Sequence, residues 1–325
     1  MEKLPKVSFI IPTYNGKKLV KRCLNAILSQ KYPRKNIEII AVDGGSIDGT
    51  LELLKKYPVK IINNKKRFPE GKGMGKSQGV KAAKNELIVF VDQDNEIQGD
   101  SWLLNMVEPL IKDKEIIGCA CKLKVEKRDN ITNRYLSLVG TDPFAIYRSI
   151  EGRMALNKIN LKDEGNYFTY IIKTENCLCT GGNCFIIRKK LLNEIHGYTQ
   201  DVEMIYELAS RGKNKLAIPK NAYTHHLTIN NYLEFLKKRN FWAMHQRSKN
   251  LEGRKYSWEP KTFREYKTFL SFFIKAITII PNFIISLKCY IKTKESAWLL
   301  HAPSVFLITL IYAKVGFQGM FKKTL

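Results

Sequence analysis

Two carboxylates one residue apart are the first residues in this chain whose types and spacing could do chemistry. Asp92 and Asp94 directly follow the apolar run Leu87–Val91, whose β-branched residues favour a short buried strand. A strand that is buried on both faces belongs to a parallel sheet. Ligands of open α/β sheets lie beyond the carboxyl ends of the strands, which is where Asp92 and Asp94 are expected. Taken alone, such a pair is more often a polar turn than a ligand site.

Two further polar segments are expected at the same edge of the sheet. The apolar segment Val7–Pro12 is followed by Thr13-Tyr14-Asn15, and Ile37–Val42 is followed by Asp43-Gly44-Gly45-Ser46. Together these segments place aromatic, carboxylate and glycine groups on one rim, as a nucleotide site requires. The chain has no G-x-G-x-x-G after its first strand, and its Gly71–Gly79 stretch does not match the phosphate-loop pattern.

The elements that must position these groups alternate between strand and helix. Strand-like segments alternate with helical ones over about 90 residues, which predicts βαβ units and a parallel sheet. Beyond Asp94 the pattern changes, and Glu126–Thr174 is expected to be irregular. The expected strands are 7–12, 37–42, 59–62, 87–91, 116–125, 184–187 and 216–219, and the expected helices include 19–30, 51–56, 102–111, 189–195, 202–211 and 232–244.

The charge of the chain indicates an anionic partner. Its 325 residues carry a formal net charge of +25. From residue 229 onward there are 17 Lys and Arg against 5 Asp and Glu, next to long apolar stretches. Basic and apolar residues together favour a membrane surface over nucleic acid. Lys237-Lys238-Arg239, with Phe241 and Trp242, could lie among lipid headgroups; a solvated helix face is the alternative.

Two apolar stretches of the tail could enter a membrane. Phe269–Leu287 is about long enough to span a bilayer but contains Lys275 and Pro281, and Trp298–Ala313 is shorter. If both spanned, the lysines between them would face outward, against the positive-inside bias. We therefore expect a re-entrant or interfacial pair over a spanning hairpin, with core helices of a soluble protein as a third possibility.

The cysteines and the N-terminus indicate a reducing compartment. The seven cysteines include no standard zinc spacing, and the chain enters a strand-like segment without a signal-peptide pattern. We expect free, mostly buried thiols in a cytoplasmic setting.

The order of these motifs resembles the family 2 glycosyltransferases. The run VSFIIPTYNG…IEIIAVDGGSIDGT…GKSQGVKAAKNELIVFVDQDN carries the resemblance, which continues through TGGNCFIIRKKLLNEIHGY, QDVEMIYELASRG and IPKNAYTHH. It covers about residues 5–226. The resemblance implies an α/β fold of the GT-A type, with a Rossmann-like nucleotide-binding sheet, and inversion at the anomeric carbon.

The resemblance also implies roles for the donor-binding residues. Pro12, Tyr14 and Asn15 match the loop that holds the base and ribose, and Asp43 matches the carboxylate that recognises the base, typically uracil. Lys76 replaces a frequent arginine and can keep its charge but not its bidentate geometry. Asp92 would contact the ribose or the sugar.

Metal-binding and catalytic roles follow in the same way. Asp94 would bind a divalent metal on the diphosphate, and His225 matches a histidine near both; an ordinary histidine pair at a strand end is the alternative. Oxygen ligands suit Mg²⁺ or Mn²⁺, and Mg²⁺ prefers one or two carboxylates plus substrate phosphates. Asp201 matches the catalytic base, although Gln200 replaces the usual preceding glutamate; a helix N-cap is its alternative role.

The sequence thus predicts an inverting, metal-dependent glycosyltransferase with a catalytic domain at 1–228 and a membrane-associating helical tail at 229–325. The donor is expected to be a nucleotide-sugar, most typically a UDP-sugar. The acceptor is expected to be a hydroxyl of a lipid-linked or cell-surface glycan at the cytoplasmic face of the membrane, with membrane lipids but no nucleic acid as partners. The alternatives are a polyprenyl-phosphate glycosyltransferase and a non-catalytic nucleotide-sugar or membrane-binding protein.

Overall fold

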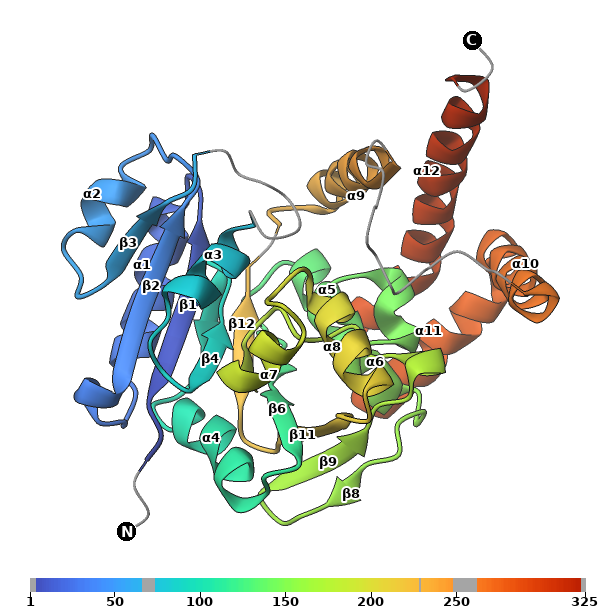
Figure 1. Cartoon of the computed structure of the whole chain (residues 1–325). Helices are drawn as coiled ribbons and strands as arrows, with labels where there is room; N and C mark the ends of the chain where they lie inside the picture. The colour runs from blue at the N-terminus through green and yellow to red at the C-terminus, as the bar shows by residue number, and fades with distance from the viewer. Residues whose placement is uncertain (1–3, 66–73, 228, 248–261, 323–325) are drawn as a thin grey trace. The chain divides into compact units, whose positions relative to one another are not determined.

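The chain forms two compact units in this computed structural model, which describes residues 4–65, 74–227, 229–247 and 262–322 (Figure 1). The first unit comprises Met1–Lys124 and Ile159–Leu227, and the second comprises Val125–Lys158 and Thr228–Leu325. One boundary between the units falls beside the domain boundary expected after residue 228, whereas Val125–Lys158 groups with the C-terminal residues. That the units correspond to a catalytic part and a membrane-associating part stays a prediction.

The first unit is built on a nine-stranded mixed sheet with the strand order β3-β2-β1-β4-β10-β6-β11-β9-β8. Strands β3, β2, β1 and β4 run parallel to one another, and β10 runs antiparallel between β4 and β6. The predicted α/β class is confirmed, with antiparallel strands added to the parallel part. The strands are β1 Val7–Thr13, β2 Ile37–Asp43, β3 Lys60–Asn63, β4 Leu87–Phe90, β6 Ile116–Ala120, β8 Lys162–Asp163, β9 Tyr167–Ile171, β10 Phe185–Arg188 and β11 Lys215–Pro219.

Helices pack on both faces of the parallel part of this sheet. Strand β1 alternates its side chains between the two faces. Phe9 packs in one cluster with Leu24 of α1 and Met106 of α4. On the opposite face, a Cβ on Gly79 of α3 would overlap the Ile10 side chain, so α3 lies close to β1 because residue 79 is glycine. The helices of this unit are α1 Lys17–Leu28, α2 Thr50–Leu54, α3 Gly75–Ala82, α4 Trp102–Lys112, α7 Lys189–Glu194 and α8 Asp201–Ser210.

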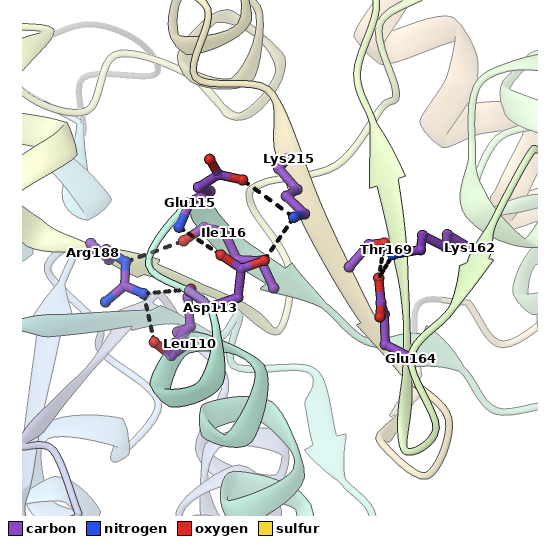
Figure 2. A network of polar contacts seen from close by, with 9 residues as sticks. All are labelled: Leu110, Asp113, Glu115, Ile116, Lys162, Glu164, Thr169, Arg188 and Lys215. Atoms are coloured by element: carbon purple, nitrogen blue, oxygen red, sulfur yellow. Dashed lines mark hydrogen bonds and ion pairs between the residues drawn. The ribbon is translucent and has the colours of Figure 1, made fainter.

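A polar network joins α4 to the central strands (Figure 2). The Arg188 guanidinium donates to the backbone carbonyls of Leu110, Ile116 and Asp113, at 2.6, 3.1 and 3.2 Å. Lys215 of β11 lies 2.7 Å from the Asp113 carboxylate. The network satisfies carbonyls at the C-terminal end of α4 that have no partner within the helix, and it fixes β10 and β11 beside β6.

A small second sheet places the segment after Asp94 beside a histidine pair. It has the order β5-β12-β7, formed by Asn95–Ile97, Tyr223–His226 and Lys122–Leu123. In the antiparallel pairing of β12 with β5, His226 lies opposite Asn95 and His225 opposite Glu96. The single strand expected at 116–125 is therefore two strands, β6 and β7, in different sheets.

The second unit is helical. Its core contains Tyr135 and Leu136 of α5, Phe235 of α9 and Trp298. The expectation of an irregular Glu126–Thr174 segment was wrong, because this stretch contains α5, α6 and β9. The helices of the unit are α5 Ile131–Val139, α6 Ile150–Ala155, α9 Tyr232–Arg247, α10 Phe263–Ile277, α11 Ile280–Thr293 and α12 His301–Lys322, with 3₁₀ turns at Pro143–Tyr147 and Ser296–Leu300.

The apolar stretches of the tail form three helices. Phe269–Leu287 is broken, since α10 and α11 meet at an angle of 75° between Ile277 and Ile280. Ser296–Gly316 is long and apolar enough to cross a membrane, but the core helix of a soluble protein meets the same criteria. In the basic cluster, Lys237 is exposed, whereas Arg239 forms an ion pair with Asp142 inside the unit.

The expectation that the thiols are free and mostly buried is confirmed. All seven are free, and all but Cys179 are buried. They act as small apolar core residues.

Candidate active site

Two loops at the carboxyl end of the parallel strands are tied together by hydrogen bonds. The Asn15 amide donates to Ser46 Oγ at 3.0 Å, and Asn15 Oδ1 accepts from the Ile47 amide at 2.9 Å. Asn15 has a φ of 44°, a conformation that asparagine tolerates better than most residues. The loop after β1 therefore takes its shape from the loop after β2.

Asp43, at the end of β2, holds its own loop. Its carboxylate accepts from the amides of Gly45 and Ser46 at 2.8 and 2.9 Å, from Ser46 Oγ at 2.6 Å and from Thr13 Oγ1 at 3.2 Å. The residue is buried. A carboxylate has about four lone-pair positions, so these four donors fill the acceptor positions of Asp43. Its first role is therefore to hold the conformation of the loop.

Gln93, between the two carboxylates of the Asp92-Gln93-Asp94 motif, clamps the first loop. Its side-chain oxygen accepts from the Tyr14 amide and its side-chain nitrogen donates to the Tyr14 carbonyl, both at 3.0 Å. A Cβ on Gly16 would overlap this side chain. The Tyr14 side chain is exposed. Sequence reasoning missed Gln93, although its place between two site carboxylates was a signal.

Lys76 joins two carboxylates that are far apart in the sequence. Its ammonium lies 3.1 Å from Asp92 Oδ1 and 3.5 Å from Asp201 Oδ1, and it donates to the Gly182 carbonyl at 2.5 Å. The Lys76 side chain is 5% exposed, whereas those of Asp92 and Asp201 are 38% and 41% exposed. The cation is thus enclosed while both carboxylates remain open to a ligand.

Charge interactions within this trio shift the pKa values of Lys76 and Asp92. Burial alone would lower the pKa of Lys76, but the charges of Asp201 and Asp92 outweigh it and raise that pKa, so the ammonium stays protonated. Partial removal from water raises the pKa of Asp92, the Lys76 charge lowers it, and the Asp94 and Asp201 charges raise it again. Lys76 is therefore a fixed positive charge, and Asp92 is the carboxylate that protonates more readily than usual.

Asp201 is positioned by glycine and tyrosine neighbours. A Cβ on Gly182 would overlap the Asp201 carboxylate, so the approach requires glycine at 182. Tyr198 is buried, its ring lies 4.7 Å from that of Phe90, and its hydroxyl donates to Asp201 Oδ1. Burial first, and then the Asp201 charge, raise the pKa of Tyr198, which keeps the phenol a donor.

The alternative role of Asp201 as a helix N-cap does not hold. Gln200 occupies the N-cap position of α8, and Asp201 is the first residue of the helix. The helix has no side-chain capping hydrogen bond. The Asp201 carboxylate is directed to Lys76 and Tyr198 instead.

The histidine beside Asp94 is His226. Its Nε2 lies 3.3 Å from Asp94 Oδ2, whereas the buried His225 has its Nδ1 4.0 Å from Glu96 Oε2. Adjacent residues of a strand point to opposite faces, so only one of the two can face Asp94. The metal-neighbour role expected for His225 stays a prediction.

Asp94 and His226 fit a divalent ion as a partial ligand set. Among the residues that the structure describes, no group of three His, Cys, Asp or Glu side chains could hold a metal by itself. A carboxylate and an imidazole leave several coordination positions for phosphate oxygens, which is the arrangement that Mg²⁺ prefers. The protein side chains could thus complete a site that the donor's diphosphate mainly fills.

The family model for "Glycosyl transferase family 2" matches residues 8–195, more than half of the chain. The chain belongs to this family. The matched range contains the first three strands, Lys76, the Asp92-Gln93-Asp94 motif and Gly182, and it ends shortly before Asp201.

This family 2 glycosyltransferase is similar to bacterial glycosyltransferases. It is 28% identical over 202 residues to glycosyltransferase GlyG from Streptococcus pneumoniae, a match that covers 58% of this chain and 59% of that protein. It is 35% identical over 102 residues to a poly(ribitol-phosphate) beta-glucosyltransferase from Bacillus spizizenii, a match of 30% of this chain and 16% of that one. The chain therefore spans well under two thirds of these relatives.

Solved structures show the fold of the transferase. A mannosyltransferase from Pyrobaculum calidifontis, in complex with GDP-Man and Mn²⁺, superimposes with a TM-score of 0.56 at 16% identity, covering 96% of this chain and 88% of that one. GalNAc-T7 with UDP, GalNAc and Mn²⁺ gives a TM-score of 0.52 at 18% identity, covering 83% and 55%. The predicted GT-A fold is confirmed by these likenesses.

Proposed function

We propose that this transferase moves a sugar, with inversion, from a nucleotide-sugar to a hydroxyl of a lipid-linked or cell-surface glycan at the cytoplasmic face of the membrane. The observation that carries the proposal is the convergence of Asp92, Lys76 and Asp201 within 3.5 Å at the open end of the sheet. In such a trio, Asp92 would bind the donor and Asp201 would act as the base, with one buried cation within 3.5 Å of both.

The donor would lie on the rim formed by the first two loops. The exposed Tyr14 side chain, with Pro12 and Asn15, would take the base and ribose, and Asp43 would act by shaping the neighbouring loop. A UDP-sugar is the first donor to test; a solved structure of similar fold holds GDP-Man. Asp92 would accept from hydroxyls of the ribose or sugar.

A divalent ion, Mg²⁺ or Mn²⁺, held by Asp94 and His226 would neutralise charge on the leaving diphosphate when bound. Asp201 would accept the proton of the acceptor hydroxyl as that oxygen bonds to the anomeric carbon and the bond to the diphosphate breaks. One displacement on the face opposite the leaving group inverts the anomeric configuration. Lys76 would hold Asp201 in position during this step.

A donor panel tests the proposal. Hydrolysis and transfer would be measured for UDP-, GDP- and other nucleotide-sugars with Mg²⁺ or Mn²⁺, with Asp94→Ala as the control. We expect one donor to turn over in a metal-dependent way and Asp94→Ala to lose that turnover. Binding without turnover of any donor would leave a nucleotide-sugar-binding protein, and no binding at all would end the proposal.

Asp201→Asn separates two kinds of acceptor. A hydroxyl nucleophile needs a base, so the variant should lose about 10²-fold or more in kcat. A polyprenyl phosphate is already ionised and needs no base. Retained activity in Asp201→Asn would therefore assign the enzyme to polyprenyl-phosphate glycosylation.

A further inference from the structure

Helix α11 exposes an apolar stripe, while the side chains it buries most deeply are small or polar. A surface helix buries an apolar stripe and exposes polar residues. The positions that α11 buries are Asn282, Ser286 and Cys289. Its exposed stripe is apolar at helical spacing and comprises Ile280, Phe283, Ile284, Leu287 and Ile291, which are 68, 53, 47, 41 and 56% exposed.

The rotation of α11 about its axis is fixed by hydrogen bonds on the buried side. Asn282 Nδ2 donates to the Lys275 carbonyl at 3.0 Å, and Ser286 Oγ accepts from the Ala302 amide at 3.2 Å. A rotation that buried the apolar stripe would leave these buried polar groups without their partners. The outward direction of the apolar stripe is thus built into the packing of the second unit.

Helix α10, which meets α11 at a 75° bend, also exposes apolar residues. It buries Ala276, and its exposed positions include Tyr266, Leu270 and Ile274. These residues recur at intervals of four and lie on one side of the helix. We call the exposed apolar residues of these two helices together the α10–α11 face.

Lysines border this face, and Glu265, near the start of α10, is the one acidic residue of the two helices. Lys267, Lys275 and Lys288 are exposed, and residues 266–294 contain no Asp or Glu. Cations next to an apolar stripe complement the phosphates of anionic lipids. A purely hydrophobic contact between two proteins would not require them.

We propose that the α10–α11 face docks in the headgroup layer of an anionic bilayer, with both helices lying in the membrane plane. The helices have 15 and 14 residues, about 20 Å each, which is shorter than the roughly 30 Å of hydrocarbon that a spanning helix must cross. The 75° bend prevents them from acting as one straight span. The inference rests on the membrane setting of the proposed function and specifies the contact surface.

Vesicle flotation of the full chain tests this docking. Vesicles of phosphatidylcholine alone are compared with vesicles that also contain phosphatidylglycerol. Combined Phe283→Ser, Ile284→Ser and Leu287→Ser should weaken binding by at least about tenfold, because the exposed apolar area is lost. The matched control is Ile171→Ser, which removes an exposed apolar residue of β9, 50% exposed, and should bind like the unaltered protein.

A second variant isolates the charge contribution. Combined Lys267→Gln, Lys275→Gln and Lys288→Gln should lower the preference for phosphatidylglycerol vesicles by about tenfold or more. Bound protein should be released by alkaline carbonate, as expected for a helix that lies in the plane.

Four outcomes would overturn the inference: full binding by the serine variant, equal binding to both vesicle types, retention after carbonate, or a self-association in solution that the serine substitutions abolish. The last would show that a second copy of the chain covers the face. No donor or acceptor is present in the assay, so its failure is distinguishable from a failed donor panel.

Discussion

The Asp201 carboxylate occupies the space into which any side chain on residue 182 would project. The prospective base can occupy its position only because residue 182 is glycine. The Gly182 carbonyl also accepts a hydrogen bond from the Lys76 ammonium. One residue without a side chain therefore positions both an anion and a cation of the site.

Gly182→Ala should displace Asp201 and lower kcat by about 10²-fold, because a shift of about 1 Å at a reacting group has that effect. The measurement is steady-state transfer with the donor identified by the panel. Gly316→Ala is the control, since a Cβ there meets nothing within 4 Å. Near-normal turnover in Gly182→Ala would show that catalysis does not depend on the position of the Asp201 carboxylate.

Lys76→Met should move the acid limit of donor binding to higher pH. Burial raises the pKa of Asp92, and the Lys76 charge opposes that rise. Without the cation, Asp92 would be protonated at a higher pH. Donor binding followed by calorimetry from neutral to acid pH measures the shift. The control is Lys81→Met, which replaces an exposed lysine of the same helix and should leave the pH dependence of donor binding unchanged. An unchanged pH dependence in Lys76→Met would contradict the coupling of Lys76 to Asp92.

Asp43→Asn should destabilise the first unit and weaken donor binding together. The amide that replaces one oxygen cannot accept from the Gly45 and Ser46 amides or hydroxyls, so unfolding should become easier by about 2–3 kcal/mol. Denaturant unfolding and donor titration are the measurements, with the exposed Glu52→Gln as control. Lost donor binding at unchanged stability would instead assign Asp43 to direct recognition of the base.

The two adjacent histidines should differ in what their loss affects. His226→Gln should weaken Mn²⁺ binding in the presence of UDP by about tenfold or more, as loss of a ligand or its neighbour does. His225→Gln should leave metal affinity nearly unchanged and lower thermal stability, because His225 is buried beside Glu96. Mn²⁺ titrations followed by electron paramagnetic resonance measure the first effect. The reverse pattern would restore His225 as the metal neighbour.

The parallel strands could be predicted because each carries its own signal. The segments that end at Thr13, Asp43 and Phe90 are apolar, β-branched and followed by turn residues, so local sequence fixes their type and the edge where their polar ends meet. The motif order then predicted the fold and family.

Features that depend on contacts between distant segments of the chain could not be predicted. Which of His225 and His226 faces Asp94 depends on the register of β12 against β5, and a shift by one residue exchanges the two faces. The clamp of Gln93 on Tyr14 joins residues 79 positions apart. The segment at Glu126–Thr174 was misjudged because α5 and α6 are short, and their helical state depends on packing with distant residues such as Trp298.

The path of the chain between the two units limits how the enzyme can be divided. Tyr135, Leu136 and Ile146 lie within the first half of the chain, yet they pack against Phe235, Trp298 and Ile308. A fragment ending at residue 228 would keep the former without the latter and expose their apolar surface to water. The C-terminal region is therefore no detachable anchor: the two stretches of the second unit depend on each other to fold, and a gene fragment that encodes only the family-matched part should yield an aggregation-prone product.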